Sequence, residues 1–133
     1  MTALVWVFAL LTAAVHVLVF VWEALLFPRP SVHQGVFSVP TADVPAVRLW
    51  AFGVGFYNLF LACCLVVGVA SWMAGYEVVG RTLVVAMCVF IVLSSVVLLV
   101  ADRMAMGRPR GAGVGGVLAE GLPPLAALLA AAL

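Results

Sequence analysis

Four long apolar runs constrain this chain more than any other feature of its sequence. Polar, Gly-rich or Pro-rich stretches separate the runs, which span residues 3–27, 44–73, 78–101 and 113–133. Each run is long enough to cross a bilayer as a helix, which takes about 20 mostly apolar residues. Only 8% of the 133 residues are charged, whereas a soluble domain carries roughly 25%. The sequence therefore predicts an all-α integral membrane four-helix bundle that forms a single domain.

The arginines predict how this bundle is oriented, since the chain has no lysine. Arg81 lies beside the second loop, and the other five lie in or beside the first and third loops: Arg29, Arg48, Arg103, Arg108 and Arg110. Loops rich in Arg stay on the cytoplasmic side. We therefore expect both termini outside, in the plasma (inner) membrane. No Lys or Arg precedes the first run, and the run is longer than a signal h-region, so we expect it to be retained as a helix.

The fourth run is less regular than the others. Glu120, Pro123 and Pro124 interrupt it, and we expect a helix with a kink at the prolines. The glycine pattern GAGVGG in residues 111–116 matches a dinucleotide-binding fingerprint. That fingerprint requires a preceding strand, whereas an Arg-rich turn precedes it here, so we interpret the match as accidental. Small residues at this place favour close helix packing instead.

The sequence contains no cofactor motif, nucleophile elbow or cluster of metal ligands. Cys63, Cys64 and Cys88 all fall within apolar runs, where they are expected to pack as small apolar side chains. A metal site would need further ligands near them, and none is evident. We therefore expect no metal and no cofactor. Acid–base chemistry is the reaction class that the remaining residues support.

The first run carries a polar stripe. His16 and Glu23 are seven residues apart and thus share a helix face, and Thr12 extends that face by one turn. Ionisable groups in a membrane span rarely face lipid, so the stripe should face the bundle interior. At about 1.5 Å per residue, Glu23 and Arg48 lie at similar shallow depths, which predicts an ion pair between them.

The same count predicts the partners of His16. His16 lies about 16 Å from the inner end of its run, close to the level of Tyr57 and Asn58. Glu120 on the fourth run falls between the levels of Glu23 and His16. These residues are expected to share one internal cavity. The alternative is a structural polar network that holds the helix register, although such contacts contribute well under about 1 kcal/mol each in membranes.

These positions define the candidate site. The candidate catalytic residues are His16, Glu23 and Glu120, and the candidate substrate-binding residues are Arg48, Trp22, Trp50, Tyr57 and Asn58. An interfacial aromatic belt is a competing explanation for the tryptophans, and it accounts for Trp6 and Trp72 near the outer ends of their runs. Trp22 and Trp50 lie closer to Glu23 and Arg48, where they would line the mouth of a pocket.

Three sequence features together identify a resemblance. They are the His16-x6-Glu23 spacing, the segment GFYNLFLA at Gly55–Ala62, and the Pro-interrupted fourth run. The chain resembles the DUF1304 family of small four-helix membrane proteins over nearly its whole length. The resemblance implies the fold and the membrane location. It implies no mechanism, because the family was defined without an assigned function. The chain differs from the family in carrying Gly53–Val54 where the family tends to have Asn-Gln, and Glu120 where it tends to have Gln.

Two classes of function fit these features. The first is a pocket that binds a small apolar molecule, such as a lipid-like, isoprenoid or polyketide-like compound, with acid–base isomerisation or cyclisation as its reaction. The second is proton-coupled transport or an accessory role in a membrane complex, and transport by four short helices would require a homo-oligomer. A purely structural partner subunit is a third alternative. Membrane lipid and a small apolar ligand are the expected partners, and nucleic acid is not.

Overall fold

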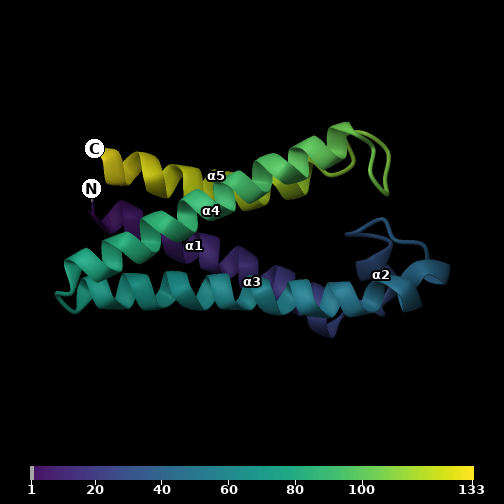
Figure 1. The fold of residues 1–133 in the computed structure, drawn as a ribbon, viewed down its shortest axis with the longest axis horizontal. Coiled ribbons are helices and arrows are strands. Elements are labelled where there is room, and N and C mark those ends of the chain that lie inside the picture. Colours follow the sequence, from purple (N-terminus) through teal and green to yellow (C-terminus); the bar gives the residue numbers. More distant parts are fainter. Residues whose placement is uncertain (1) are drawn as a thin grey trace.

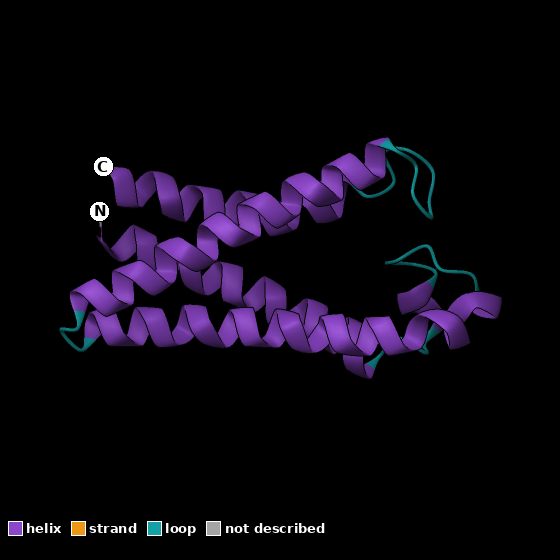
Figure 2. Cartoon of the chain, in the orientation of Figure 1, coloured by secondary structure: helices purple, strands orange, loops and turns teal. Residues whose placement is uncertain are grey.

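The structure is a computed structural model that describes residues 2–133. Helix α1 (Thr2–Phe20) continues into a π-helical turn, η1 (Val21–Leu25). The first loop contains the short helix α2 (Pro30–His33) and the 3-10 turn η2 (Thr41–Asp43). The remaining long helices are α3 (Val44–Met73), α4 (Glu77–Arg103) and α5 (Val114–Ala132). Residues 2–133 contain no strand, and the four long helices are long and apolar enough to cross a membrane (Figure 2). The chain is thus an all-α integral membrane protein.

The four long helices pack as a square. Helix α1 contacts α3 and α5, and α4 contacts the same two helices, so α1 and α4 stand at opposite corners. Helix α1 begins and α5 ends beside the α3–α4 turn, while the loops of residues 26–43 and 104–113 lie at the other end (Figure 1). The two ends of the bundle are named here the terminal end and the loop end.

Small residues let the helices pack closely at the terminal end. Gly68 of α3 meets Gly80 of α4, where a Cβ added to Gly80 would lie 2.6 Å from the Gly68 carbonyl oxygen. The buried core also lies in this half and consists of Val5, Ala9, Ala13, Ala62, Leu65, Val69, Val84, Cys88, Ile91, Ala127 and Ala130. From this contact, α3 and α4 diverge toward the loop end (Figure 1). The divergence leaves the other half of the bundle less tightly packed.

Buried polar groups form hydrogen bonds within both loops at the loop end. The His33 ring nitrogen Nδ1 bonds the Val39 carbonyl oxygen at 2.8 Å. The buried Asp102 carboxylate, at the end of α4, accepts hydrogen bonds from the backbone N–H groups of Gly111 at 2.9 Å and Gly113 at 2.7 Å. These bonds hold each loop in one conformation over the loop end of the bundle.

Helix α5 contains Pro123 and Pro124 in its interior. The helix runs from Val114 to Ala132 without a break, so the prolines do not end it, and the kink expected at them stays a prediction. Neither proline has an N–H group, so the carbonyls of Ala119 and Glu120 lose their usual partners four residues on. These two carbonyls are free to accept hydrogen bonds from elsewhere.

Candidate functional site

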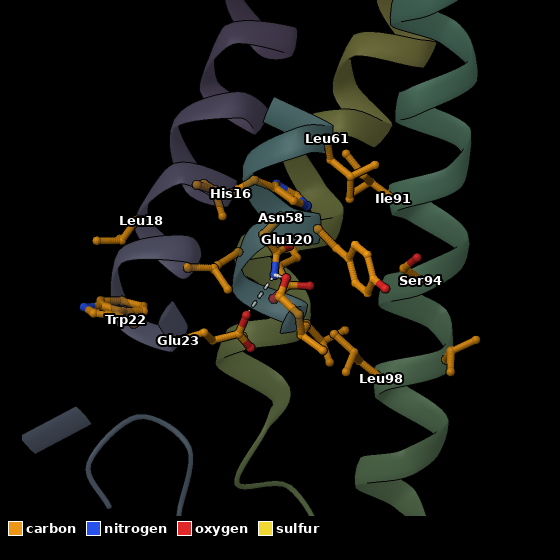
Figure 3. Close-up of a pocket in the computed structure, with 18 of the residues that line it drawn as sticks. His16, Leu18, Trp22, Glu23, Asn58, Leu61, Ile91, Ser94, Leu98 and Glu120 are labelled. Carbon is orange, nitrogen blue, oxygen red and sulfur yellow. Dashed lines mark hydrogen bonds between the residues drawn. The ribbon is translucent and has the colours of Figure 1, made fainter. Parts of the chain in front are cut away.

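A cavity of about 760 Å³ occupies the loop-end half of the bundle. All four long helices and both loops contribute to its lining, which is mostly apolar. Six of the eight candidate residues line it: His16, Trp22, Glu23, Tyr57, Asn58 and Glu120. Figure 3 shows His16 and Glu23 on α1 and η1 directed toward Asn58 and Glu120 on the opposing helices. Polar groups from helices far apart in the sequence therefore converge in one apolar cavity.

Glu23 lies in the π-helical turn that ends the first helix. The turn is closed by a hydrogen bond from the Leu26 N–H to the Val21 carbonyl oxygen at 2.9 Å, a five-residue step. The turn packs on α3 at Gly55, where an added Cβ would lie 2.9 Å from the Ala24 nitrogen and 3.1 Å from the Glu23 Cβ. Single π-helical turns inside α-helices recur at functional sites. Here the turn brings the Glu23 backbone against α3.

Asn58 is the direct partner of Glu23. Its side-chain Nδ2 donates to Glu23 Oε2 at 2.9 Å and to the Val54 carbonyl oxygen at 3.2 Å. A carbonyl oxygen can only accept, so the amide orientation follows from the chemistry of the second bond. Both amide hydrogens are thereby used, and the Asn58 carbonyl oxygen is left as an acceptor at the cavity.

His16 has one ring nitrogen fixed and the other available. The side chain is only 3% exposed, and Nδ1 lies 2.9 Å from the Thr12 carbonyl oxygen. Because that oxygen can only accept, Nδ1 carries the proton. In a neutral imidazole, Nε2 then has a free lone pair. His16 thus offers the cavity a base or a hydrogen-bond acceptor.

Two further ionisable groups line the cavity. Glu120 on α5 is half-buried and has no hydrogen-bond partner among residues 2–133. Arg108, in the third loop, also lines the cavity. Its guanidinium group lies so close to Gly113 that a Cβ added to Gly113 would collide with it. The Asp102 bonds described above fix this loop and so determine where Arg108 lies.

The predicted ion pair between Glu23 and Arg48 is not present among the described residues. Arg48 is exposed, lies outside the cavity lining, and forms no salt bridge in residues 2–133. Glu23 is level with Asn58 instead, ten residues or about 15 Å farther along α3 than Arg48. The depth estimate was wrong because it placed the end of the first run and the start of the second run at the same level. In fact the first turns of α3 extend past η1 (Figure 1).

The aromatic candidates are placed differently from one another. Trp50 is 72% exposed and outside the cavity lining, so it does not contribute to the pocket. Trp22 borders the cavity, with its ring turned away from Glu23 in Figure 3. Tyr57 lines the cavity from its edge and is 68% exposed.

Sequence reasoning missed Arg108 and Ser94 as residues of the cavity lining. Arg108 entered only the charge count for orientation, although its place in an Arg-rich turn next to the fourth run was visible. Ser94 lines the cavity from α4 and donates its hydroxyl to the Phe90 carbonyl oxygen at 3.0 Å. A polar pair, Ser94 and Ser95, in an otherwise apolar run was the available signal. No group of three or more potential metal ligands occurs among the residues described.

Comparison with known proteins places the chain in a family. The profile of DUF1304, described as a protein of unknown function, matches residues 10–132. The chain belongs to the DUF1304 family. No curated protein and no solved structure is significantly similar to it. The matched range includes every residue of the cavity described above. The candidate site of this DUF1304 member therefore lies entirely within the matched part of the chain.

Proposed function

We propose that this protein binds a small apolar molecule, of lipid-like, isoprenoid or polyketide-like character, in the cavity at its loop end. The convergence of His16, Glu23, Asn58 and Glu120 on one mostly apolar cavity carries the proposal. Ligand sites are typically apolar cavities of about 300 to 1,000 Å³ with a few placed polar groups. The cavity of about 760 Å³ falls within that range.

Acid–base isomerisation or cyclisation is the reaction that this set of groups supports. A protonated carboxyl of Glu23 or Glu120 would give its proton to one carbon of a double bond, which leaves a positive charge on the other carbon, and His16 Nε2 would take a proton from a carbon next to that charge. The double bond thereby moves, or a second double bond first attacks the cationic carbon and closes a ring before the proton is lost, with no change in oxidation state. Asn58 and Tyr57 would orient the substrate. Donor and acceptor roles are interchangeable in this scheme.

The proposal includes a location and an orientation. The cavity would lie on the cytoplasmic half of the plasma membrane, since most arginines lie at the loop end. Both termini would then face outward. The polar groups of the cavity would sit within the depth of the bilayer, where a buried polar group needs a partner or a ligand.

Mass spectrometry of small molecules extracted from the purified protein tests the binding. We expect one apolar compound in near-stoichiometric amount, and a several-fold loss of it in Glu23→Gln and Glu120→Gln. Glu77→Gln is the matched control, because Glu77 is an exposed carboxyl at the start of α4, outside this cavity. If the parent and all three variants yield only the same bulk membrane lipids, ligand binding is wrong.

Proton-coupled transport is the second candidate. The cavity reaches the loop end, where Val36, Phe37 and Arg108 contribute to its lining, so a path to the aqueous side is short. Native mass spectrometry distinguishes the two. A ligand-bearing monomer supports the binding or enzymatic function, and a stable homo-oligomer that moves protons in vesicles supports transport.

A further inference from the structure

The stripe of α3 that faces α4 is covered by α4 near Gly68 but is exposed nearer the loop end. At Gly68 the stripe lies against α4, where an added Cβ would be 3.0 Å from Val84 and 3.1 Å from Leu83. Tyr57 lies eleven residues earlier, which at about 100° per residue returns to within about 20° of the same direction. Tyr57 is nevertheless 68% exposed, although it lines the cavity.

The stripe of α4 that faces α3 is likewise covered at one end and exposed nearer the loop end. Leu83 lies beside Gly68, and Phe90 and Val97 follow it by seven and fourteen residues, within about 40° of its direction. Phe90 is 53% exposed and Val97 is 66% exposed, and both line the cavity. Side chains that should be covered by the opposite helix are thus open on both helices. The cavity therefore opens sideways between α3 and α4, toward the acyl chains of a bilayer.

The polar wall reached through this opening consists mainly of hydrogen-bond acceptors. The acceptors are His16 Nε2, the carboxyl oxygens of Glu23 and Glu120, and the Asn58 carbonyl oxygen. Ala119 and Glu120, whose backbone carbonyls the two prolines leave without their usual partners, also line the cavity. The cavity is lined by two carboxyl groups and by one guanidinium group, that of Arg108. Such a wall favours a head group that donates hydrogen bonds and disfavours an anionic one.

We propose that the α3–α4 opening is a lateral portal, and that the ligand is a long-chain amphiphile with a hydrogen-bond-donating head, an alcohol or an amine. The head would lie at Glu23 and His16, and the chain would leave the cavity between Tyr57, Phe90 and Val97 into the bilayer. This inference rests on the proposed binding function and specifies its ligand class and its route of entry.

Photolabelling with a diazirine derivative of hexadecanol tests the portal. The full-length protein is placed in phosphatidylcholine vesicles with the probe and irradiated, and the labelled residues are mapped by mass spectrometry. We expect labelling near Glu23 and Tyr57 that an excess of hexadecanol abolishes. Val97→Trp fills the opening and should reduce this labelling several-fold. Val96→Trp is the matched control, because Val96 is 51% exposed but lies outside the cavity lining.

Phe90→Trp is a second blocking variant at the opposite end of the opening and should reduce labelling as Val97→Trp does. If competable labelling is equal in the parent and in both blocking variants, the portal is wrong. If Glu23→Gln loses that labelling in the same experiment, the binding function still stands. Labelling that excess hexadecanol cannot compete, spread evenly over all four helices, would overturn both. The diazirine derivative of hexadecanoic acid should label several-fold less than the alcohol, and equal labelling would overturn the assignment of a donating head.

Discussion

The hydrogen bond from Asn58 to Glu23 joins two helices inside the cavity. A pair of single variants and their double variant can measure what this bond contributes to the free energy of unfolding. Asn58→Leu should lower the free energy of unfolding by about 1 to 3 kcal/mol, because it leaves the Glu23 carboxyl without its donor. Adding Glu23→Leu should recover part of that loss, since both polar partners are then gone. Thermal unfolding of the two single variants and the double variant in detergent measures this. Strictly additive effects would mean that the pair is not coupled.

His16 is expected to matter for ligand retention more than for stability. His16→Asn keeps an N–H group near the position of Nδ1, where it can still bond the Thr12 carbonyl, but it removes Nε2. The folded state should therefore survive while the bound compound is lost. The control is Thr12→Val, a fully buried position on the same helix face that does not line the cavity. Loss of the compound in both variants would indicate a structural effect of this helix face, and its retention in both would show that His16 Nε2 does not hold the ligand.

The sequence predicted most of the candidate residues that line the cavity, but it did not predict which of them lie next to one another. His16, Glu23 and Asn58 were identifiable because a polar side chain in an apolar helix is costly and needs a partner. Pairing was harder, because depth estimates depend on where each helix begins relative to the others. Arg48 matched Glu23 on that count, yet α3 extends past η1 and places Asn58 at the level of Glu23 instead.

At the scale of helices, the π-helical turn η1 depends on close contact with α3. Gly55→Ala would place a Cβ 2.9 Å from the Ala24 nitrogen and 3.0 Å from the Ala24 Cβ, so η1 must shift. We expect a lower unfolding temperature and weaker ligand retention. Gly53→Ala is the control, because nothing lies within 4 Å of an added Cβ there. It should gain up to about 1 kcal/mol from helix propensity.

A rise in stability from Gly55→Ala, equal to that from Gly53→Ala, would show that η1 adapts without cost. The turn itself was not predictable from the sequence. Residues 21–25 contain no Gly or Pro, and nothing in them distinguishes a π-helical turn from the α-helix predicted over residues 3–27. In the structure the turn lies against Gly55 of α3, a tertiary contact that local sequence does not reveal. Helix α3, by contrast, coincides with the apolar run of residues 44–73, because polar loop residues bound that run on both sides.

The whole molecule divides into a packed half and an open half. Small residues such as Ala9, Ala13, Ala62 and Ala127 fill the core of the terminal end and let four helices approach closely. The loop end has larger side chains around a cavity, and the two loops are fixed over it by His33 and Asp102. The packed half can therefore hold the helix ends in place, while the open half would accommodate the proposed ligand.

This arrangement makes a prediction about the membrane orientation of the whole molecule. Single cysteines at Thr2 and Tyr76 lie at the terminal end, and those at Ala42 and Met106 lie at the loop end. In intact cells a membrane-impermeant maleimide should label the first two and not the last two, because five of the six arginines lie in or beside the loops at the loop end. The parent chain, whose three cysteines lie within α3 and α4, gives the background labelling. Labelling of Ala42 and Met106 alone would place the loop end outside and reverse the orientation. Labelling of Thr2 without Tyr76 would contradict the square packing itself, since both lie at one end of the bundle.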